Sequence, residues 1–319
     1  MASNLATQVF GKDIQNGLWP LNDFLSQCKD DTMFVNNDKV NLPHAGTAPT
    51  VEEGRTSAST PEKRTDSATQ YDMAELSTAA TWLQYSEELI VNYNKRESIL
   101  SEHRNALQKA LAEKVAHKWA RGGDSENSWS TKPDKVKTTG ADRAVLLRTA
   151  GSGGVAVTGY RSAVTFENIL EVIGKLNYSD VPADGRIAVI PSSFFSDLLQ
   201  LEEFKSSDYV NVKPLPGAPL SFSWLGMQWY VRSFVTAWTY VADSVLKTPT
   251  ADSVATDCAG ALFYHKDFVR AAKGDVKVFL NLDMANLYGS QMSALARYGA
   301  IGSRSNSKGI VNLVETYVS

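Results

Sequence analysis

One long stretch of the chain places its large hydrophobic residues mainly seven and four positions apart, which keeps them on one face of an α-helix. These residues are Tyr93, Leu100, Leu107, Leu111, Val115 and Trp119. The same stripe is widened by Ile99, His103, Ala106 and Ala110. No glycine or proline interrupts residues 94–121. The pattern therefore predicts one continuous helix about 40 Å long, a beam that crosses the whole molecule.

Both ends of this predicted helix carry the expected signals. Asn94 is a candidate N-cap, and Glu97 follows it at the spacing of a capping box. Lys118 and Arg121 lie in the last turns, where the helix dipole favours cations, and Gly122 with Gly123 ends the run.

The second half of the chain mixes shorter helices with strands. Phe166, Ile169, Leu170, Ile173 and Leu176 predict an amphipathic helix with Thr165 as its cap. A turn then leads into a buried strand at 187–190, after which Pro191 and Ser192 or Ser193 open a second helix that runs through Leu201. Further strands are predicted at 227–235, 261–265, 275–282 and 309–318. The segments alternate without a βαβ rhythm, which predicts the α+β fold class.

The N-terminal part and the connections have weaker patterns. Residues 1–39 hold scattered apolar residues with little period, apart from a short helix expected at 21–27. This favours an extended arm that packs on something else, with an ordinary N-terminal lobe as the alternative. Residues 71–91 read as extended chain, and residues 122–160 read as loop-rich.

Residues 46–70 form an unusual polar stretch. Val51 is the only large apolar residue among them, so the stretch cannot bury a core of its own. Unstructured loops of this length are uncommon inside compact domains. Because threonine and serine are frequent and apolar residues resume on both sides, the stretch predicts either a long projecting β-hairpin or a disordered segment.

Composition and charge narrow the possible classes. A net charge of −3 excludes a nucleic-acid-binding polycation for the chain as a whole. There is neither a signal peptide nor an apolar run long enough for a membrane, so no membrane association is expected. Cys28 and Cys258 are too far apart in sequence to suggest a disulfide framework. We expect a soluble protein made in a reducing cytoplasm.

The search for catalytic chemistry finds little. His103 and His117 are fourteen residues apart, about 21 Å along a helix, too far for one metal ion. Gly151, Gly153 and Ala156 match a dinucleotide-binding fingerprint, but the residues after them are a poor first turn for the required helix. We therefore expect no catalytic residues, no metal and no cofactor, and a nucleotide-binding enzyme built on residues 145–160 is the remaining enzymatic alternative.

The long helix is locally basic, although the chain is not. Its seven lysine and arginine residues exceed its three glutamates by four. Such a surplus suits either contact with a polyanion without base reading or an ordinary solvated helix face.

Three segments carry a resemblance to a known family. Residues 176–201, LNYSDVPADGRIAVIPSSFFSDLLQL, resemble the Val-Pro-x-x-Gly-Arg segment of the major capsid proteins of tailed double-stranded-DNA bacteriophages. Residues 261–272, ALFYHKDFVRAA, are similar to the family's Ala-Leu-x-x-His-x-x-Ala-Val segment, with Phe268 at an alanine position. The ending at 296–315, ARYGAIGSRSNSKGIVNLVE, resembles the family's closing strand.

The resemblance implies the family's fold and its division into parts. These are an N-terminal arm at 1–39, an extended loop (E-loop) at 40–75, a peripheral domain with the long spine helix at 76–124, an axial domain at 125–260, and returning strands shared by both domains at 261–319. Encapsulins, which share the fold and store cargo enzymes, are the alternative shell.

The resemblance also implies function and partners. The chain would be a structural protein of the virion, assembled in the host bacterial cytoplasm into hexamers and pentamers of an icosahedral shell around double-stranded DNA. The implied partners are copies of itself, portal protein and decoration proteins. Because only about forty residues precede the polar stretch, we also expect a separate scaffolding protein and no removal of a long N-terminal domain.

Two residue sets are expected to matter in such a shell. Basic residues of the long helix would face the packaged DNA as charge alone, namely Arg104, Lys109, Lys114 and Lys118. Pro182, Gly185 and Arg186 would form a structural turn before the buried strand, where a guanidinium can satisfy several loop carbonyls at once.

Overall fold

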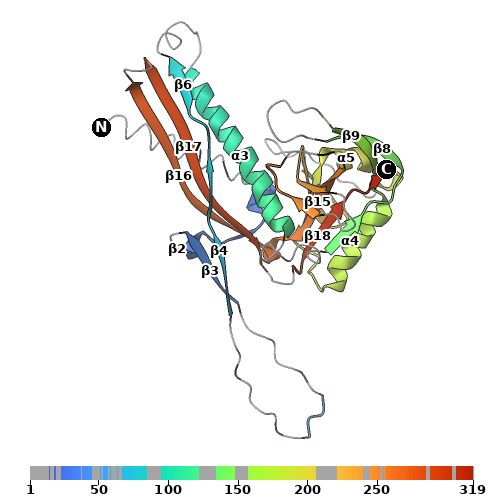
Figure 1. Ribbon diagram of the computed structural model, residues 1–319. Coiled ribbons are helices and arrows are strands. Elements are labelled where there is room, and N and C mark those ends of the chain that lie inside the picture. The colour runs from blue at the N-terminus through green and yellow to red at the C-terminus, as the bar shows by residue number, and fades with distance from the viewer. Residues whose placement is uncertain are drawn as a thin grey trace.

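The chain folds into a body and a long helix-covered sheet beside it, with a strand pair that leads away from both (Figure 1). The computed structural model describes residues 14, 18, 23–36, 38–44, 51, 53–56, 58, 63, 67–84, 95–121, 134–147, 157–205, 221–239, 245–251, 254, 256–284, 288–303 and 307–318. The fold is mixed α and β, as the sequence predicts.

The helix-covered sheet is built on two long antiparallel strands, β16 (Val269–Met284) and β17 (Gly289–Gly302). β5 (Ala74–Ser77) and β6 (Thr81–Gln84) both pair with β17, and β1 (Lys29–Asp30) pairs with β16. Helix α3 (Lys95–Arg121) runs alongside these strands (Figure 1). This confirms the long predicted helix over 95–121, while its proposed cap Asn94 and the first stripe residue Tyr93 lie outside the described residues.

The body is an eight-stranded sheet whose central strands are β10 (Arg186–Pro191) and β15 (Asp257–His265). The other strands are β11 (Ser221–Trp224), β12 (Met227–Arg232), β13 (Thr236–Thr239), β14 (Val245–Lys247), β18 (Ile310–Val314) and β7 (Asp134–Lys137). Its helices are α4 (Phe166–Tyr178), α5 (Ser192–Leu198) and α6 (Glu202–Lys205). β10 is buried at every position, which explains the apolar run at 187–190 that follows Arg186.

Two small sheets complete the described structure. β8 (Asp142–Leu147), β9 (Val157–Ser162) and β19 (Tyr317–Val318) form one of them. β2 (Val35–Asn36), β3 (Lys39–His44) and β4 (Ser67–Asp72) form the other. The 3-10 helices η1 (Phe24–Ser26), η2 (Thr32–Phe34) and η3 (Lys266–Phe268) lie at the junctions between the larger parts.

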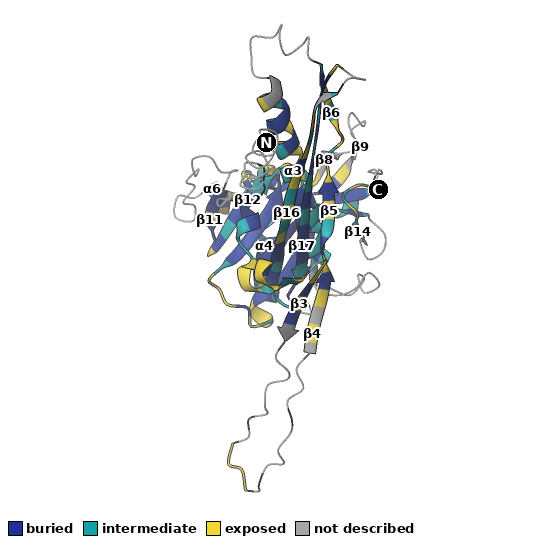
Figure 2. Cartoon of the chain, turned by 90° about the vertical axis from the view of Figure 1, so that its left-hand side faces the viewer, coloured by how far each residue is buried: buried dark blue, intermediate teal, exposed yellow. Residues whose placement is uncertain are grey.

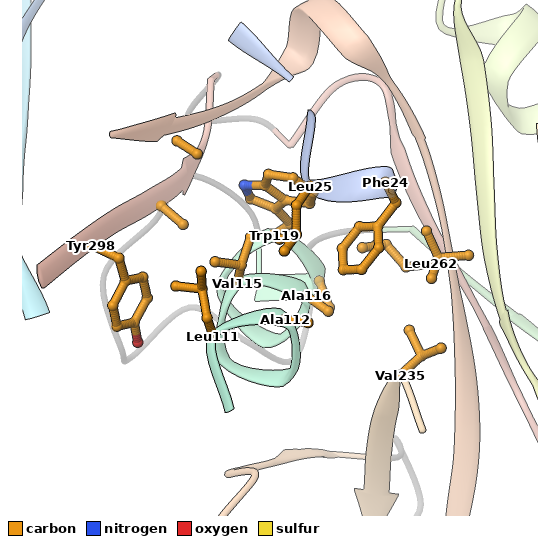
Figure 3. Packing of buried hydrophobic residues seen from close by; sticks show 14 of the residues in the cluster. Phe24, Leu25, Leu111, Ala112, Val115, Ala116, Trp119, Val235, Leu262 and Tyr298 are labelled. Atoms are coloured by element: carbon orange, nitrogen blue, oxygen red, sulfur yellow. The ribbon is translucent and has the colours of Figure 1, made fainter. Parts of the chain in front are cut away.

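The main core lies where α3 passes between the sheet and the body. Leu100, Leu107, Leu111, Val115 and Trp119 are all buried in one cluster with residues of β16, β17 and β15. Figure 3 shows Trp119 at the centre of this packing, with Phe24 and Leu25 on one side and Leu111, Val115 and Tyr298 nearby. The stripe of the predicted helix is thus its buried face, whereas Ala106, which was expected to widen that stripe, is exposed.

The structure confirms the shorter helices with adjusted ends. Thr165 caps α4, with a capping box closed by Asn168, and α5 begins directly after Pro191. α5 ends at Leu198 and not at Leu201. The helix expected at 21–27 is only the three-residue η1.

Several strand predictions are wrong or incomplete. The region 122–160, predicted to be loop-rich, contains β7, β8 and the start of β9. The hydrophobic pattern did not predict β17, because its sequence is rich in alanine, glycine and serine rather than β-branched residues. Those small residues have a packing reason, since Ala294, Ala296 and Ala300 are buried in the cluster that holds α3.

The N-terminal segment also differs from the expected free arm. Ile14, Leu18, Phe24 and Leu25 are buried in the main core of their own chain. The expectation that this segment packs on something else is therefore wrong for these residues, and the alternative of an ordinary N-terminal lobe describes them better.

Candidate functional site

The strand pair β3–β4 flanks the polar stretch 46–70 that the sequence singled out, and Ser67 to Gln70 of β4 belong to that stretch. Its register runs through six antiparallel pairs, from Lys39↔Asp72 to His44↔Ser67. Figures 1 and 2 show the pair leading away from the body. The hairpin prediction is confirmed for this stem, while most of residues 45–66 lie outside the described residues. Val51, the stretch's one large apolar residue, is described and is 96% exposed.

The root of this stem sits on the face of β16 and β17. Val40, Leu42, Tyr71 and Met73 form a small buried cluster with Ala272 of β16. Gly299 of β17 makes room for it, because an added Cβ there would lie 2.7 Å from the Tyr71 ring. The cluster is far smaller than the main core, so apolar contacts alone hold the stem weakly.

Polar contacts reinforce the same root. The Tyr71 hydroxyl donates to Asp31 Oδ2 over 3.2 Å, and Arg270 Nη1 donates to Asp31 Oδ1 over 2.8 Å. Arg297 pairs with Asp38 at the start of the stem and lies 3.4 Å from Glu75 of β5. In each of these pairs the two residues are far apart in sequence. Local sequence patterns therefore gave no signal for the contacts.

The four basic residues expected to face DNA are distributed around α3. Lys109 is exposed, whereas Arg104, Lys114 and Lys118 are partly buried. Five residues separate Lys109 from Lys114, which turns their side chains about 140° apart around the helix axis. The helix therefore does not bring all four onto one face.

Lys118 is engaged inside the chain. Its Nζ atom lies 4.9 Å from the centre of the Tyr298 ring, a cation–π contact with β17. Burial, with Arg121 as the next cause, lowers the pKa of Lys118. Burial also lowers the pKa of the neighbouring His117 to about 4, and the positive charges of Arg121, Lys114 and Lys118 act in the same direction. The last two turns of α3 thus hold a compact, partly buried group of cations.

The turn before β10 has the geometry expected from its sequence. Gly185 adopts a left-handed conformation with φ +86°, which other residues rarely adopt. Arg186 Nε donates to the Pro182 carbonyl over 2.8 Å, and its Nη2 donates to the Val181 carbonyl and to Asn177 Oδ1. One guanidinium therefore bridges the C-terminal part of α4 and the loop that leads into β10.

Several large apolar side chains remain uncovered on the described surface. Phe279 of β16 and Trp82 of β6 are about half exposed, and strand register places both on the sheet face opposite α3. Met33 of η2 and Tyr178 of α4 are more than 90% exposed. Exposed apolar residues of this size gather at protein–protein contacts more often than elsewhere on a surface.

Metal-binding clusters and membrane-spanning helices were two further possibilities for the described residues. No group of three or more histidine, cysteine, aspartate or glutamate residues among them could hold a metal ion. Within the same described part, no helix has both the length and the apolar character to cross a membrane. The glycine-rich fingerprint at 151–156 lies outside the described residues.

Comparison with known proteins identifies what this architecture resembles. A family model described as "Phage capsid protein" matches residues 35–313. A search of curated proteins finds no match to the sequence.

Solved structures resemble the chain over almost its whole length. The capsid structure of the cyanophage P-SCSP1u aligns with a TM-score of 0.61 and 16% identity, covering 93% of this chain and 88% of that one. The capsid of Ralstonia phage GP4 aligns with a TM-score of 0.58 and 11% identity, covering 91% and 86%. The mature capsid of bacteriophage PhiM1 gives a TM-score of 0.56 and 10% identity, covering 92% and 86%. At these identities the structural likeness establishes the fold.

Proposed function

The chain belongs to the phage capsid protein family, and from this premise we propose that it assembles into hexamers and pentamers of a shell that encloses double-stranded DNA. It is a major capsid protein of the tailed-phage type, located in the virion capsid and structural rather than enzymatic. Self-assembly into a lattice follows from this class, whereas the capsomer types and the enclosed DNA are the proposal.

The β3–β4 stem is the observation that best supports assembly through this chain's own surfaces. It leads away from the body and carries a polar stretch whose one large apolar residue, Val51, is exposed. A projection of this kind adds almost nothing to its own core, so we propose that it lies over a neighbouring copy and pairs with it through backbone and polar contacts. The uncovered side chains of Trp82 and Phe279 are candidates for burial against other copies.

We assign the parts of the family fold to the observed layers. The layer of α3, β16 and β17 is the proposed peripheral domain, and the eight-stranded body is the proposed axial domain. Among the returning strands at 261–319, β16 and β17 belong to the sheet of the proposed peripheral domain. β18 and the part of β15 that falls in this range belong to the eight-stranded sheet of the proposed axial domain.

Further partners are part of the same proposal. Identical subunits in hexamers and pentamers meet at different angles, so a shell of one size needs an additional determinant of curvature. We propose that a separate scaffolding protein supplies it, that a portal protein occupies one vertex, and that decoration proteins bind outside.

We propose that lysine and arginine residues of α3 contact the DNA. Because Lys109 and Lys114 point to different sides of the helix, they cannot both face the interior in the same way. Substituting each with glutamine and measuring the salt needed to release DNA from opened shells separates them. Substitution of the lysine that faces the shell interior should reduce the salt dependence of DNA release by about one ion equivalent. Substitution of the other lysine should leave it unchanged. An unchanged salt dependence in both variants would contradict a DNA-facing role for either residue.

Electron microscopy and sedimentation of the purified protein, with and without its scaffolding partner, test the main proposal. We expect closed icosahedral particles that contain double-stranded DNA when isolated from infected cells. A population of small oligomers under all conditions would overturn the shell, and particles filled with protein cargo would indicate an encapsulin-like compartment instead.

A further inference from the structure

Residues 23–34 contact every major part of the molecule. At one end, Asp23 accepts a hydrogen bond from Arg232 Nη1 in β12 over 2.8 Å, and the Phe24 ring packs 5.9 Å from Trp119 in α3. At the other end, the Asp31 amide donates to the Ala271 carbonyl in β16, and Thr32 accepts from the Lys273 amide. The segment therefore ties the body, the long helix and the long sheet together.

The C-terminal end of segment 23–34 also contacts the β3–β4 stem. Asp31 is only 1% exposed, and its carboxylate joins two groups from distant parts of the chain, Arg270 of β16 and Tyr71 of β4. Arg270 is in turn fixed by a 3.1 Å hydrogen bond from its Nε to Ser303 Oγ. Tyr71 pairs with Val40 in the stem register, so its hydroxyl reports directly on where the stem lies.

Both partners of this carboxylate favour its ionised form. Burial raises the pKa of Asp31, and the Arg270 charge with the Tyr71 hydrogen bond acts against that rise. A buried carboxylate of this kind costs free energy unless its partners stay in place, so its geometry is sharply defined. The neighbouring Asp30 contrasts with it, because Asp30 and its partner Lys273 are both about half exposed and lie 3.5 Å apart.

We propose that Asp31 is a positioning residue for assembly: with Arg270 and Tyr71 it fixes the direction in which the β3–β4 stem leaves the sheet of β16 and β17. The apolar cluster under the stem keeps it attached, and the polar group selects one orientation because it requires three atoms from three segments to meet. The local part of this proposal does not depend on the proposed shell, whereas its consequence for assembly does.

Hydrogen exchange of the unassembled subunit tests the local part. Tyr71→Phe keeps the ring and removes one hydroxyl, and Asp31→Asn removes the charge. Both should speed the slow amides of β3 and β4 by about tenfold or more, since a hydrogen bond to a buried charge is lost, while the amides of β10 stay unchanged. Asp30→Asn, which removes the same charge one residue away at an exposed site, is the matched control and should change neither set.

Two outcomes would overturn the local part. One is stem exchange in Tyr71→Phe and Asp31→Asn equal to that of the wild type. The other is equal acceleration of stem and β10 amides, which would mean that Asp31 only contributes to general stability.

Assembly of the same variants tests the consequence. Asp31→Asn should give irregular or incomplete particles, whereas Asp30→Asn should give regular ones. Regular Asp31→Asn shells, despite a loosened stem, would contradict the role in assembly. If the wild-type protein forms no shells, the proposed function fails, but the exchange result is unaffected.

Discussion

The core around Trp119 and the stem of the extended loop belong to one chain but are held in different ways. Trp119 is fully buried, lies 5.2 Å from the Tyr264 ring, and donates from Nε1 to the Arg270 carbonyl over 2.9 Å. The stem is held by a small apolar cluster and by polar contacts, which include the group around Asp31 and the Arg297–Asp38 pair. The first region stabilises the subunit by itself. The second has a defined position but buries little, which suits a part that completes its contacts on another copy.

This difference implies that stability and assembly respond to different residues. Changes in the Trp119 core should alter the free energy of unfolding of the isolated subunit. Changes in the loop should alter particle formation and leave that free energy almost the same.

The largest loss is expected for Trp119→Ala. Removing a fully buried indole leaves a cavity and removes its hydrogen bond, which should lower the free energy of unfolding by about 3–5 kcal/mol. Urea denaturation of the unassembled subunit measures this. Trp82→Ala is the control, because Trp82 is 46% exposed in the isolated chain and should cost less than about 1 kcal/mol. Unchanged stability in Trp119→Ala would show that the helix does not anchor the core.

A smaller loss is expected for Arg186→Lys. The guanidinium serves three acceptors at fixed angles, and one ammonium cannot reach all of them. We expect a loss of about 2 kcal/mol and a lower folding yield, with no enzymatic activity affected.

Arg232→Lys is the matched comparison for that variant. Arg232 donates to a single carboxylate, Asp23, which a lysine can also reach. Its loss of stability should therefore be the smaller of the two. Equal losses in the two variants would mean that the charge of Arg186, and not its three-way geometry, is what matters.

The pH dependence of the free energy of unfolding should show that His117 has a lowered pKa in the folded chain. Its pKa is about 4 in the folded chain, because of burial and the charges of Arg121, Lys114 and Lys118, against about 6.5 when unfolded. Between these values the unfolded state binds a proton that the folded state does not. The contribution of His117 is therefore fully present above pH 6.5 and is lost as the pH falls towards 4, by at most about 1.4 kcal/mol per pH unit.

A comparison of wild type with His117→Gln between pH 7.5 and 5 isolates this contribution. The variant should lose less stability on acidification than the wild type does. Parallel stability curves for the two proteins would show that His117 is not held neutral by its surroundings.

The two regions also differ in how far the sequence predicts them. The α3 stripe repeats at helical spacing over many turns, so both the helix and its buried face follow from a local pattern. The role of Arg186 follows from the Gly-Arg turn beside an apolar strand. Both depend on residues that are close in sequence.

The parts that sequence analysis missed depend on contacts between distant residues. Asp31 is 40 residues from Tyr71 and 239 from Arg270, and no local pattern links them. Phe24 and Leu25 looked like anchors of a free arm because their partner Trp119 is almost a hundred residues away. The hydrophobic pattern missed β17 because its small residues suit close packing against α3 and have low strand propensity.

The smallest effect on stability, and the largest on assembly, is expected from shortening the extended loop. Replacing Thr50 to Asp66 with a short glycine–serine link removes Val51, which is 96% exposed, and no residue of the four buried clusters. Loop-closure cost varies slowly with length, so the free energy of unfolding should change by less than about 1 kcal/mol.

The shortened protein should keep its secondary structure and its β3–β4 stem. It should nevertheless fail to form closed particles, even with scaffolding protein present, because it lacks the segment that we propose reaches the neighbouring copy. Circular dichroism, urea denaturation and electron microscopy of matched preparations measure both properties together. A replacement of the same length by a scrambled sequence of residues 50–66 separates reach from specific contacts, since it keeps the reach and changes the contacts. Regular particles from the shortened protein would mean that this stretch is only a surface loop, and that the lattice is held by the body alone.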